Sequence, residues 1–343
     1  MALGLYGYTI VNGYSIPVTA NSLDETITPL VDEGVHGYGN TSTHGDAYSR
    51  LNYCIGAVTH EGQIGGSVFT GTGNASTAFK EMLRSAIIGG TSGTCRRNGL
   101  YIIGSPGGGA YTYRYPGLAS DYPSIDPTLL KCLCDNFTIN FTAGGIVTYT
   151  ASYKAVGRSL VTTTPGNGSY SFEPTTPYTS IVANDDSNPL NWFQAPFRVF
   201  GASTGTEETY LNSGATITAW TLTIANNVVL EHASSGTNFP NIVDIGQMVI
   251  TGSFTYFMPD ADYSGNLKQS ATIIIPFGGI KLVLGHIYIN NAPVPMPGAN
   301  AIVTRTVNFE AFAPGAGKSV TDPLSGYTYT SAEHDASLVT AGL

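Results

Sequence analysis

Four segments alternate apolar and polar residues with the two-residue period of a β-strand. They are residues 135–142, 147–153, 215–225 and 247–257, and Gly144-Gly145 separates the first two as a turn would. The alternation in 215–225 ends at Asn226-Asn227, and the following run, 228–231, resembles a return strand. The apolar side supplies the candidate core residues Phe137, Ile139, Phe141, Trp220, Leu222 and Ile224. The other side, called the polar set below, consists of Thr138, Asn140, Thr148, Thr150, Ser152, Thr221, Thr223, Thr251, Ser253 and Thr255.

One segment, residues 75–88, has the period of a helix instead. Ser76 stands near its expected start, and Gly89-Gly90 follows its expected end. The apolar positions recur at i, i+3, i+4, i+7 and i+8, and they are Phe79, Met82, Leu83, Ala86 and Ile87. The pattern predicts a helix that packs this stripe on a sheet.

The order of these features suggests two similar domains in tandem. The strand pairs at 135–155 and 215–257 share one design, as expected after duplication of a β domain. Two prolines break the alternation in 188–196, so we expect the junction there. We expect domains at 51–190 and 191–314, with further strands at 271–289 and 301–314. Residues 1–50 and 315–343 show no sustained period and are expected to form terminal arms.

The composition favours a mainly β protein with few charges. Of 343 residues, 42 are Gly and 21 are Tyr, while only 11% are charged. The 14 Lys and Arg residues are outnumbered by 23 Asp and Glu residues, so no basic face is expected to bind phosphates. This argues against a protein that reads DNA sequence. A large neutral surface is unusual for a soluble monomer and favours self-assembly.

Targeting and membrane signals are weak. The N-terminal MALGLYGYTIVNG lacks a basic region, a continuous apolar stretch and a cleavage-type site, so synthesis in the cytosol is expected. No stretch approaches the roughly 20 apolar residues of a membrane helix, so membrane insertion is not expected.

Signals for catalysis, cofactors or metals are also weak. The glycine-rich stretch 104–114 lacks the Lys-Ser/Thr ending of a phosphate loop. His44 and Asp46 form a close histidine–carboxylate pair, but no nucleophile motif accompanies them. No zinc spacing connects the four cysteines, which are expected to be buried free thiols: Cys54, Cys95, Cys132 and Cys134. We therefore expect no enzyme activity, no cofactor and no metal.

The polar set has two readings. One face of a β-sandwich is ordinarily polar because it faces solvent. Such a face normally carries Lys and Glu for solubility, and these residues are nearly absent from the polar set and its surroundings. A uniform, neutral hydroxyl surface suits a face that looks into a confined aqueous bore.

At the level of motifs, the chain resembles the tail tube proteins, or major tail proteins, of long-tailed bacteriophages. In the first half, HEGQIGGSVFTGTGNASTAFKEMLRSAIIG is similar to the family's Gly-Ser strand and following helix, whose pattern appears here as Met82, Leu83, Ala86 and Gly89. DNFTINFTAGGIVTYTASYKAVG resembles the family's strand, Gly-Gly turn and return strand. In the second half, the similar segments are ITAWTLTIANNVV and NIVDIGQMVITGSFTYFMPD. The second half lacks an equally clear helix, and the arms match no family feature.

The resemblance implies two tandem tail-tube-like β-sandwich domains, the first with a flanking helix. Their inner sheets would join those of neighbours into a closed β-barrel ring around a DNA-wide channel. Family rings commonly hold six such domains, so two per chain imply a trimer with pseudo-six-fold symmetry. The polar set would line the channel, and stacked rings would form the tail tube through which DNA is ejected.

The implied partners are other copies of the chain and the tail tape measure, tail tip and terminator proteins, while phage DNA would pass without specific binding. The implied location is the virion tail, after synthesis in the bacterial cytoplasm. The arms are candidates for contacts between stacked rings.

Two other classes remain open from the sequence. A host glycan-binding tail adhesin or a capsid decoration protein can have the same Gly-, Thr- and Tyr-rich sandwich. An adhesin should show aromatic and acidic loops, and the run 111–117 is the one loop of that kind. A β-sandwich glycan hydrolase is the enzymatic alternative, and an activity screen on polysaccharides would detect it.

Overall fold

The computed structural model describes residues 8–11, 14–31, 53–87, 110–114, 124–163, 187–192, 197–201, 217–232, 238–240, 242–257, 271–277, 280–291, 302–311, 320–321, 328–329 and 338–341. This part of the chain is mainly β, with one helix, as the sequence predicts. The elements up to residue 163 are β1 (Tyr8–Val11), β2 (Tyr14–Pro17), β3 (Ala20–Val31), β4 (Tyr53–Ser67), β5 (Phe69–Gly71), α1 (Asn74–Ile87), β6 (Ala110–Arg114), β7 (Ser124–Thr142) and β8 (Thr148–Thr163).

The remaining elements are all strands. They are β9 (Ser187–Pro189), β10 (Arg198–Gly201), β11 (Ile217–Ala225), β12 (Val228–Glu231), β13 (Ile242–Ile245), β14 (Val249–Phe257), β15 (Ala271–Phe277), β16 (Ile280–Asn291), β17 (Thr304–Ala311), β18 (Val320–Thr321), β19 (Thr328–Tyr329) and β20 (Leu338–Ala341).

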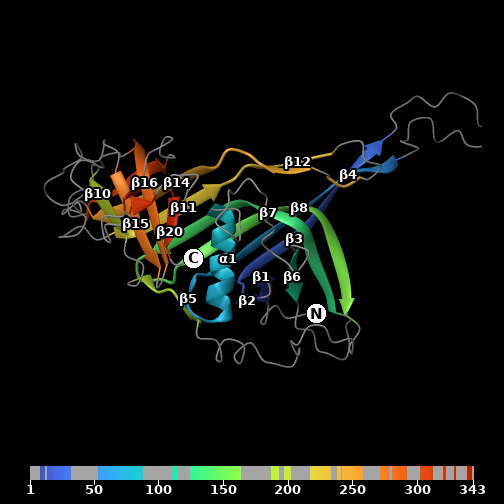
Figure 1. Ribbon diagram of the computed structural model, residues 1–343, viewed down its shortest axis with the longest axis horizontal. Coiled ribbons are helices and arrows are strands. Elements are labelled where there is room, and N and C mark those ends of the chain that lie inside the picture. The colour runs from blue at the N-terminus through green and yellow to red at the C-terminus, as the bar shows by residue number, and fades with distance from the viewer. Residues whose placement is uncertain are drawn as a thin grey trace, which may run out of the picture.

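Most of these strands join one large antiparallel sheet (Figure 1). Eight of them lie side by side in the order β3-β4-β8-β7-β11-β14-β17-β16. Each strand pairs antiparallel with its neighbour. Alternating apolar and polar positions favour this arrangement, because an antiparallel sheet can bury one face and leave the other face in water. Among the described strands the sheet stays open and does not close into a barrel.

The eight strands fall into two groups of four with the same arrangement. The first quartet is β3, β4, β7 and β8, and the second quartet is β11, β14, β16 and β17. In each quartet the order along the sheet is first, second, fourth, third. Residues 136–142 of β7 pair with residues 219–225 of β11, so the quartets share one continuous sheet.

The predicted helix is present as α1, which lies against the sheet (Figure 1). Its predicted apolar stripe, Phe79, Met82, Leu83, Ala86 and Ile87, is buried. At its start the Ser76 N–H donates to Ser187 Oγ at 2.9 Å, and at its end the Ala86 carbonyl accepts from Asn226 Nδ2 at 3.0 Å. Both ends of the helix therefore find hydrogen-bond partners in distant parts of the chain.

The covered face of the sheet forms one apolar core across both quartets. Phe79 of α1 packs on Tyr149, with ring centroids 5.5 Å apart. Phe141 of β7 stacks on Trp220 of β11 at 5.6 Å, across the junction between the quartets. The core thus follows the β7–β11 pairing and is continuous across the two halves of the sheet.

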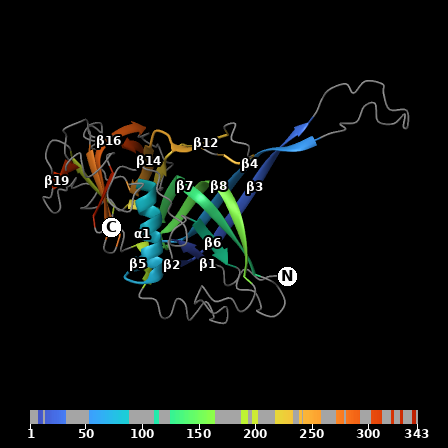
Figure 2. The same cartoon turned by 45° about the vertical axis from the view of Figure 1, so that its right-hand side comes forward.

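The run after Asn226-Asn227 does not return along β11, contrary to the sequence interpretation. The partner of β11 is β14, and β12 pairs with β13 in a separate two-stranded ribbon. Asn227 has a φ of 50°, and the Asn226 N–H donates to the Asp135 carbonyl on β7 at 2.8 Å. The chain therefore continues past β7 toward β4 (Figure 2).

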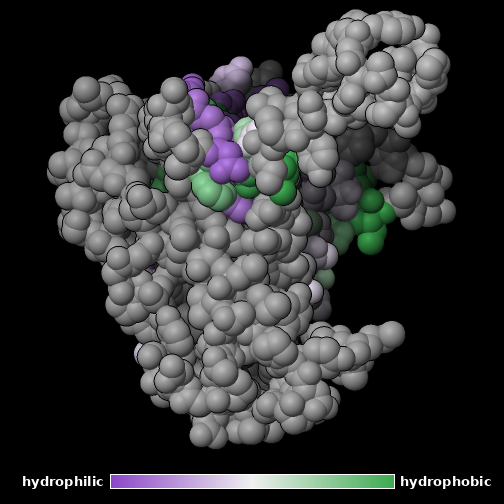
Figure 3. Space-filling view, turned by 90° about the vertical axis from the view of Figure 1, so that its right-hand side faces the viewer, coloured by the Kyte–Doolittle hydropathy of each residue, from purple (hydrophilic) through white to green (hydrophobic). Residues whose placement is uncertain are grey.

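The described parts of both expected arms contribute strands. β3 pairs with β4 from Ala20 to Val31, and the hairpin they form projects from the body of the molecule (Figure 1). At the other terminus β20 pairs with β16. Seen from the side to which the hairpin points, the described surface carries hydrophilic and hydrophobic groups next to each other (Figure 3). The sequence did not predict these strands, because their pairing partners lie far away in the chain.

Candidate functional surface

The polar set lies on one face of the large sheet, called the polar face below. Backbone register places most of it in two neighbouring rows across β8, β7, β11 and β14. One row is Thr150, Thr138, Thr223 and Thr251, and the other is Thr148, Asn140, Thr221 and Ser253. Ser152 and Thr255 extend the face at opposite ends along the strands. The polar face therefore continues from the first quartet into the second.

Hydroxyl groups on the polar face bond to one another across neighbouring strands. The Thr221 and Ser253 hydroxyls lie 2.9 Å apart, and those of Thr138 and Thr223 lie 3.2 Å apart. Thr255 extends this pattern to Thr306 of β17 at 2.8 Å. β-Branched threonine suits a strand, and paired hydroxyls satisfy part of each other's hydrogen-bonding capacity. The resulting surface is polar, neutral and half-exposed.

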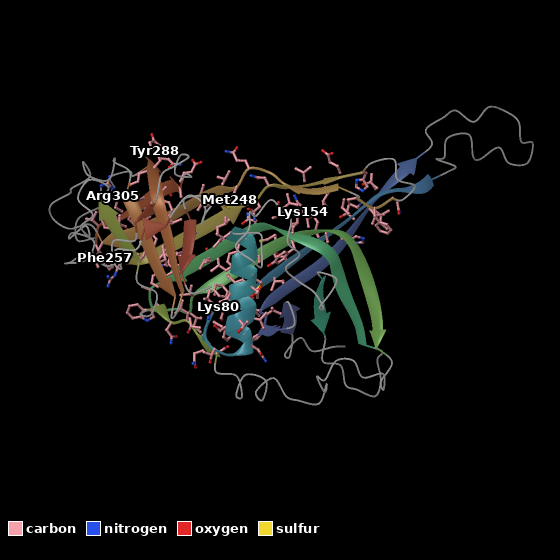
Figure 4. The ribbon with its side chains drawn as sticks, in the orientation of Figure 1. Lys80, Lys154, Met248, Phe257, Tyr288 and Arg305 are labelled. Carbon is pink, nitrogen blue, oxygen red and sulfur yellow. The ribbon has the colours of Figure 1, made fainter. Side chains whose placement is uncertain are left out.

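Charged residues on this side of the sheet stand at the borders of the two rows. Glu310 of β17 is opposite Thr251 at one border. Lys154 of β8 is opposite Glu61 of β4 at another, and it lies close to β12 (Figure 4). The rows themselves consist only of Thr, Ser and Asn. They offer hydroxyls and amides for weak hydrogen bonds, but no cation for a phosphate.

The opposite face of the same strands is apolar and buried. The six candidate core residues Phe137, Ile139, Phe141, Trp220, Leu222 and Ile224 are all buried there. Burial raises the pKa of the neighbouring Tyr149 hydroxyl, so this ring stays neutral within the core. Arg305 is also buried on this side, in line with Val307 and Phe309, as its place in the alternation of β17 predicts.

One polar cluster beside the rows escaped the sequence analysis. Asn226 Nδ2 donates to the carbonyls of Ala86 and Cys134, both at 3.0 Å. Asp135 accepts the Val228 N–H through Oδ1 at 2.7 Å and pairs with Lys154 Nζ at 3.2 Å. The cluster ties the end of β11 to α1, β7 and β8. Its visible signal is the register shift between Cys134 and Asn136, which only strand pairing reveals.

The other sequence candidates add no chemistry to this surface. His44, Asp46 and the stretch 101–109 lie outside the described residues, and residues 110–114 form β6. Cys134 is buried. The described residues contain no group of three or more metal-ligating side chains. No described helix is long and apolar enough to cross a membrane.

Comparison with known proteins gives the chain a family. The family model described as phage tail tube protein matches residues 55–311, a range that holds most of both quartets and the whole polar face. No curated protein matches the chain. The chain belongs to the phage tail tube protein family and is a structural protein of a phage tail.

Proposed function

We propose that copies of this protein assemble head to tail into closed rings of three chains, and that the rings stack into a tube that conducts DNA into the host. The observation that carries the proposal is the continuous polar face, shared by both quartets of one open sheet. A heterologous contact between copies generates a ring when its rotation closes. Closure would also cover the sheet edges that a chain rich in β-formers would otherwise expose.

The polar set is proposed to line the bore. DNA must pass without being held, and a wall of neutral hydroxyls gives its phosphates no cationic partner. The net charge of −9 adds weak repulsion, which decays over about 8 Å at physiological salt. The function of this surface is then to let DNA slide.

The remaining organisation is proposed from the same arrangement. We assign residues 51–190 and 191–314 to two tail-tube domains, supported by the pairing of β9 with β5 on the first side of this boundary. Apart from β3 and β20, which belong to the large sheet, residues 1–50 and 315–343 are proposed to contact neighbouring rings. Tape measure, tip and terminator proteins are the proposed partners of the tube, which is assembled after synthesis in the bacterial cytoplasm.

Negative-stain electron microscopy of the purified protein, with light-scattering mass, tests the assembly. We expect hollow tubes or stacked discs that grow from monomers as concentration rises. A protein that remains a small oligomer at every concentration and temperature contradicts the proposal.

A triple substitution tests the bore. Thr138→Lys, Thr223→Lys and Thr251→Lys together place cations in one row of the polar face, and DNA ejection from phages carrying them should slow by on the order of tenfold, because each Lys can hold a phosphate. The matched control is Thr72→Lys, Thr77→Lys and Asn188→Lys, at accessible positions in or next to α1 and away from the polar face. Tubes must form in both variants by microscopy. Ejection at the normal rate through tubes of the first variant would show that this face does not line the channel.

A further inference from the structure

The two quartets correspond strand by strand, and a shared glycine–aromatic pair shows which residues of the two quartets are equivalent. Gly66 of β4 is opposite Tyr149 of β8, and Gly252 of β14 is opposite Phe309 of β17. In both places a glycine of the second strand lies against a buried aromatic ring of the fourth strand. By position in the sheet β11 corresponds to β3 and β14 to β4, so the repeat differs from the one that the sequence suggested.

This correspondence also identifies equivalent positions next to the glycines, and in each quartet they form one row across the four strands. In the first quartet the row is Ala20, Gly65, Thr150 and Thr138. In the second quartet the row is Thr223, Thr251, Glu310 and Tyr288. Within the chain the two rows meet where Thr138 pairs with Thr223. The last residue of the second row, Tyr288, has no such neighbour beyond it among the described strands, and its side chain is 60% exposed.

Both outer edges of this eight-strand run are open in the described part of the chain. β3 pairs with β4 alone. β16 pairs with β15 only as far as Ile287 on the side away from β17, so residues 288–291 form an open edge. β16 and β3 lie on opposite sides of α1 in both ribbon views (Figures 1 and 2). Figure 4 shows Tyr288 at the β16 end.

We propose that β16 of one chain pairs antiparallel with β3 of a second copy, in the register by which β7 pairs with β11 inside the chain. Tyr288 then stands opposite Ala20 of the next copy, as Thr138 stands opposite Thr223. This inference rests on the proposed ring and names the strands that close it. The contact continues the sheet, and with it the side that carries the polar set, from one chain into the next.

The residues farther along β3 explain why the proposed contact would be short. In this antiparallel register residues 288–291 face Ala20, the first residue of β3, and the three residues before it, whereas Asp24, Glu25 and Pro29 follow farther along, beside the part of β16 that β15 already covers. Charges and proline on an edge strand oppose the addition of another strand, and proline has no N–H to donate. The same strand thus offers one segment for pairing and protects the rest.

Disulfide trapping tests the register. The variant Ala20→Cys with Tyr288→Cys is assembled into tubes, oxidised and separated on a non-reducing gel. Directly opposite strand positions lie within disulfide reach. We expect covalent dimers and trimers, formed at least about tenfold more than in the single variants, which account for the native cysteines.

Two matched variants serve as positive and negative controls. Thr138→Cys with Thr223→Cys has the same proposed geometry within one chain and should form an internal disulfide with no gain in mass. Asp24→Cys with Tyr288→Cys is four residues out of register, roughly 13 Å along the strand, and should stay uncrosslinked. Two outcomes would overturn the edge pairing. In one, tubes crosslink the internal pair but not Ala20→Cys with Tyr288→Cys, and in the other they crosslink the shifted pair instead. Neither outcome would contradict the proposed tube.

Hydrogen exchange on the unmodified protein gives a second test that needs no substitution. On passing from monomer to tube, the backbone amides of residues 18–20 and 288–291, which face each other in this register, should exchange at least about tenfold more slowly. Tubes without added protection in these two segments overturn the pairing. A chain that never leaves the monomeric state overturns both the pairing and the proposed function.

Discussion

At the scale of single residues, Asn226 shows how one amide can hold three elements together. Its Nδ2 group donates to carbonyls of α1 and β7, and its backbone N–H donates to a third carbonyl at Asp135. The side chain is buried, so neither carbonyl has water as an easy substitute. The position matters because it closes the end of β11 just beside the polar face.

Replacing this side chain should destabilise the monomer. Asn226→Ala leaves the buried Ala86 and Cys134 carbonyls without this donor, and we expect a loss of about 2–4 kcal/mol in the free energy of unfolding. Chemical denaturation followed by circular dichroism measures it. The adjacent Asn227→Gly serves as control and should cost under about 1 kcal/mol, because glycine accepts the φ of 50° and the side chain is exposed. Equal losses in both variants would contradict the role given to Asn226.

Residue burial was predictable along the strands, and long-range polar contacts were not. Alternation alone places Phe137 and Trp220 in the core and Thr138 on the other side, since successive side chains in a strand point to opposite faces. Periodicity carries no information on which distant carbonyl an amide will meet. The partners of Asn226 therefore appear only in the folded chain.

At the scale of elements, the helix and the β7–β8 hairpin follow directly from local sequence. The five residues of the α1 stripe all lie between Phe79 and Ile87, and Gly144 adopts a φ of 84° in the turn between β7 and β8. The β12–β13 ribbon and the strands of the arms do not follow, because their pairing is set by non-local contacts. β3, for example, lacks a sustained alternation and owes its place to β4.

The two glycines opposite aromatic rings should differ in their tolerance of a side chain. A Cβ on Gly252 would stand 2.6 Å from the Thr221 carbonyl oxygen and also meet the Phe309 ring, whereas at Gly66 the nearest atom is the Pro17 carbonyl oxygen at 3.1 Å. We expect Gly252→Ala to cost about 2–3 kcal/mol of unfolding free energy, and Gly66→Ala about 1 kcal/mol or less. Denaturant titrations of the two variants compare them directly. A larger loss at Gly66 would argue against the close packing of β14 on β17.

At the scale of the whole molecule, the sequence pattern predicts a mainly β chain with a polar face, and the chain's motifs resemble the same family that the family model matches. The eight-strand order could not be read from the sequence, because pattern does not specify which strands become neighbours. For the same reason the observed repeat differs from the expected one. The sequence matches β7 with β11, because the two strands have similar patterns, whereas in the sheet β11 takes the position that β3 has in the first quartet.

The proposed ring makes a prediction about mass and symmetry. Single discs trapped during assembly should weigh three times the 36.0 kDa of one chain. Averaged end-on images should look six-fold at low detail and three-fold at high detail, because the quartets are alike in arrangement and different in side chains. Mass photometry and image averaging measure these quantities. A disc of six chains would contradict the proposed pairing of one quartet with the next around the ring.

The β7–β11 pairing also has a consequence for how assembly is controlled. Because both strands belong to one polypeptide, this joint forms at an effective concentration set by the connecting chain and is independent of how much protein the cell holds. Only the proposed joint between chains responds to dilution. The two joints also differ in chemistry, with Thr138 and Thr223 in one and Tyr288 and Ala20 in the other. In the proposed tube, mutation at the joint between chains would therefore adjust the concentration at which tubes appear while the stability of the folded subunit stays the same.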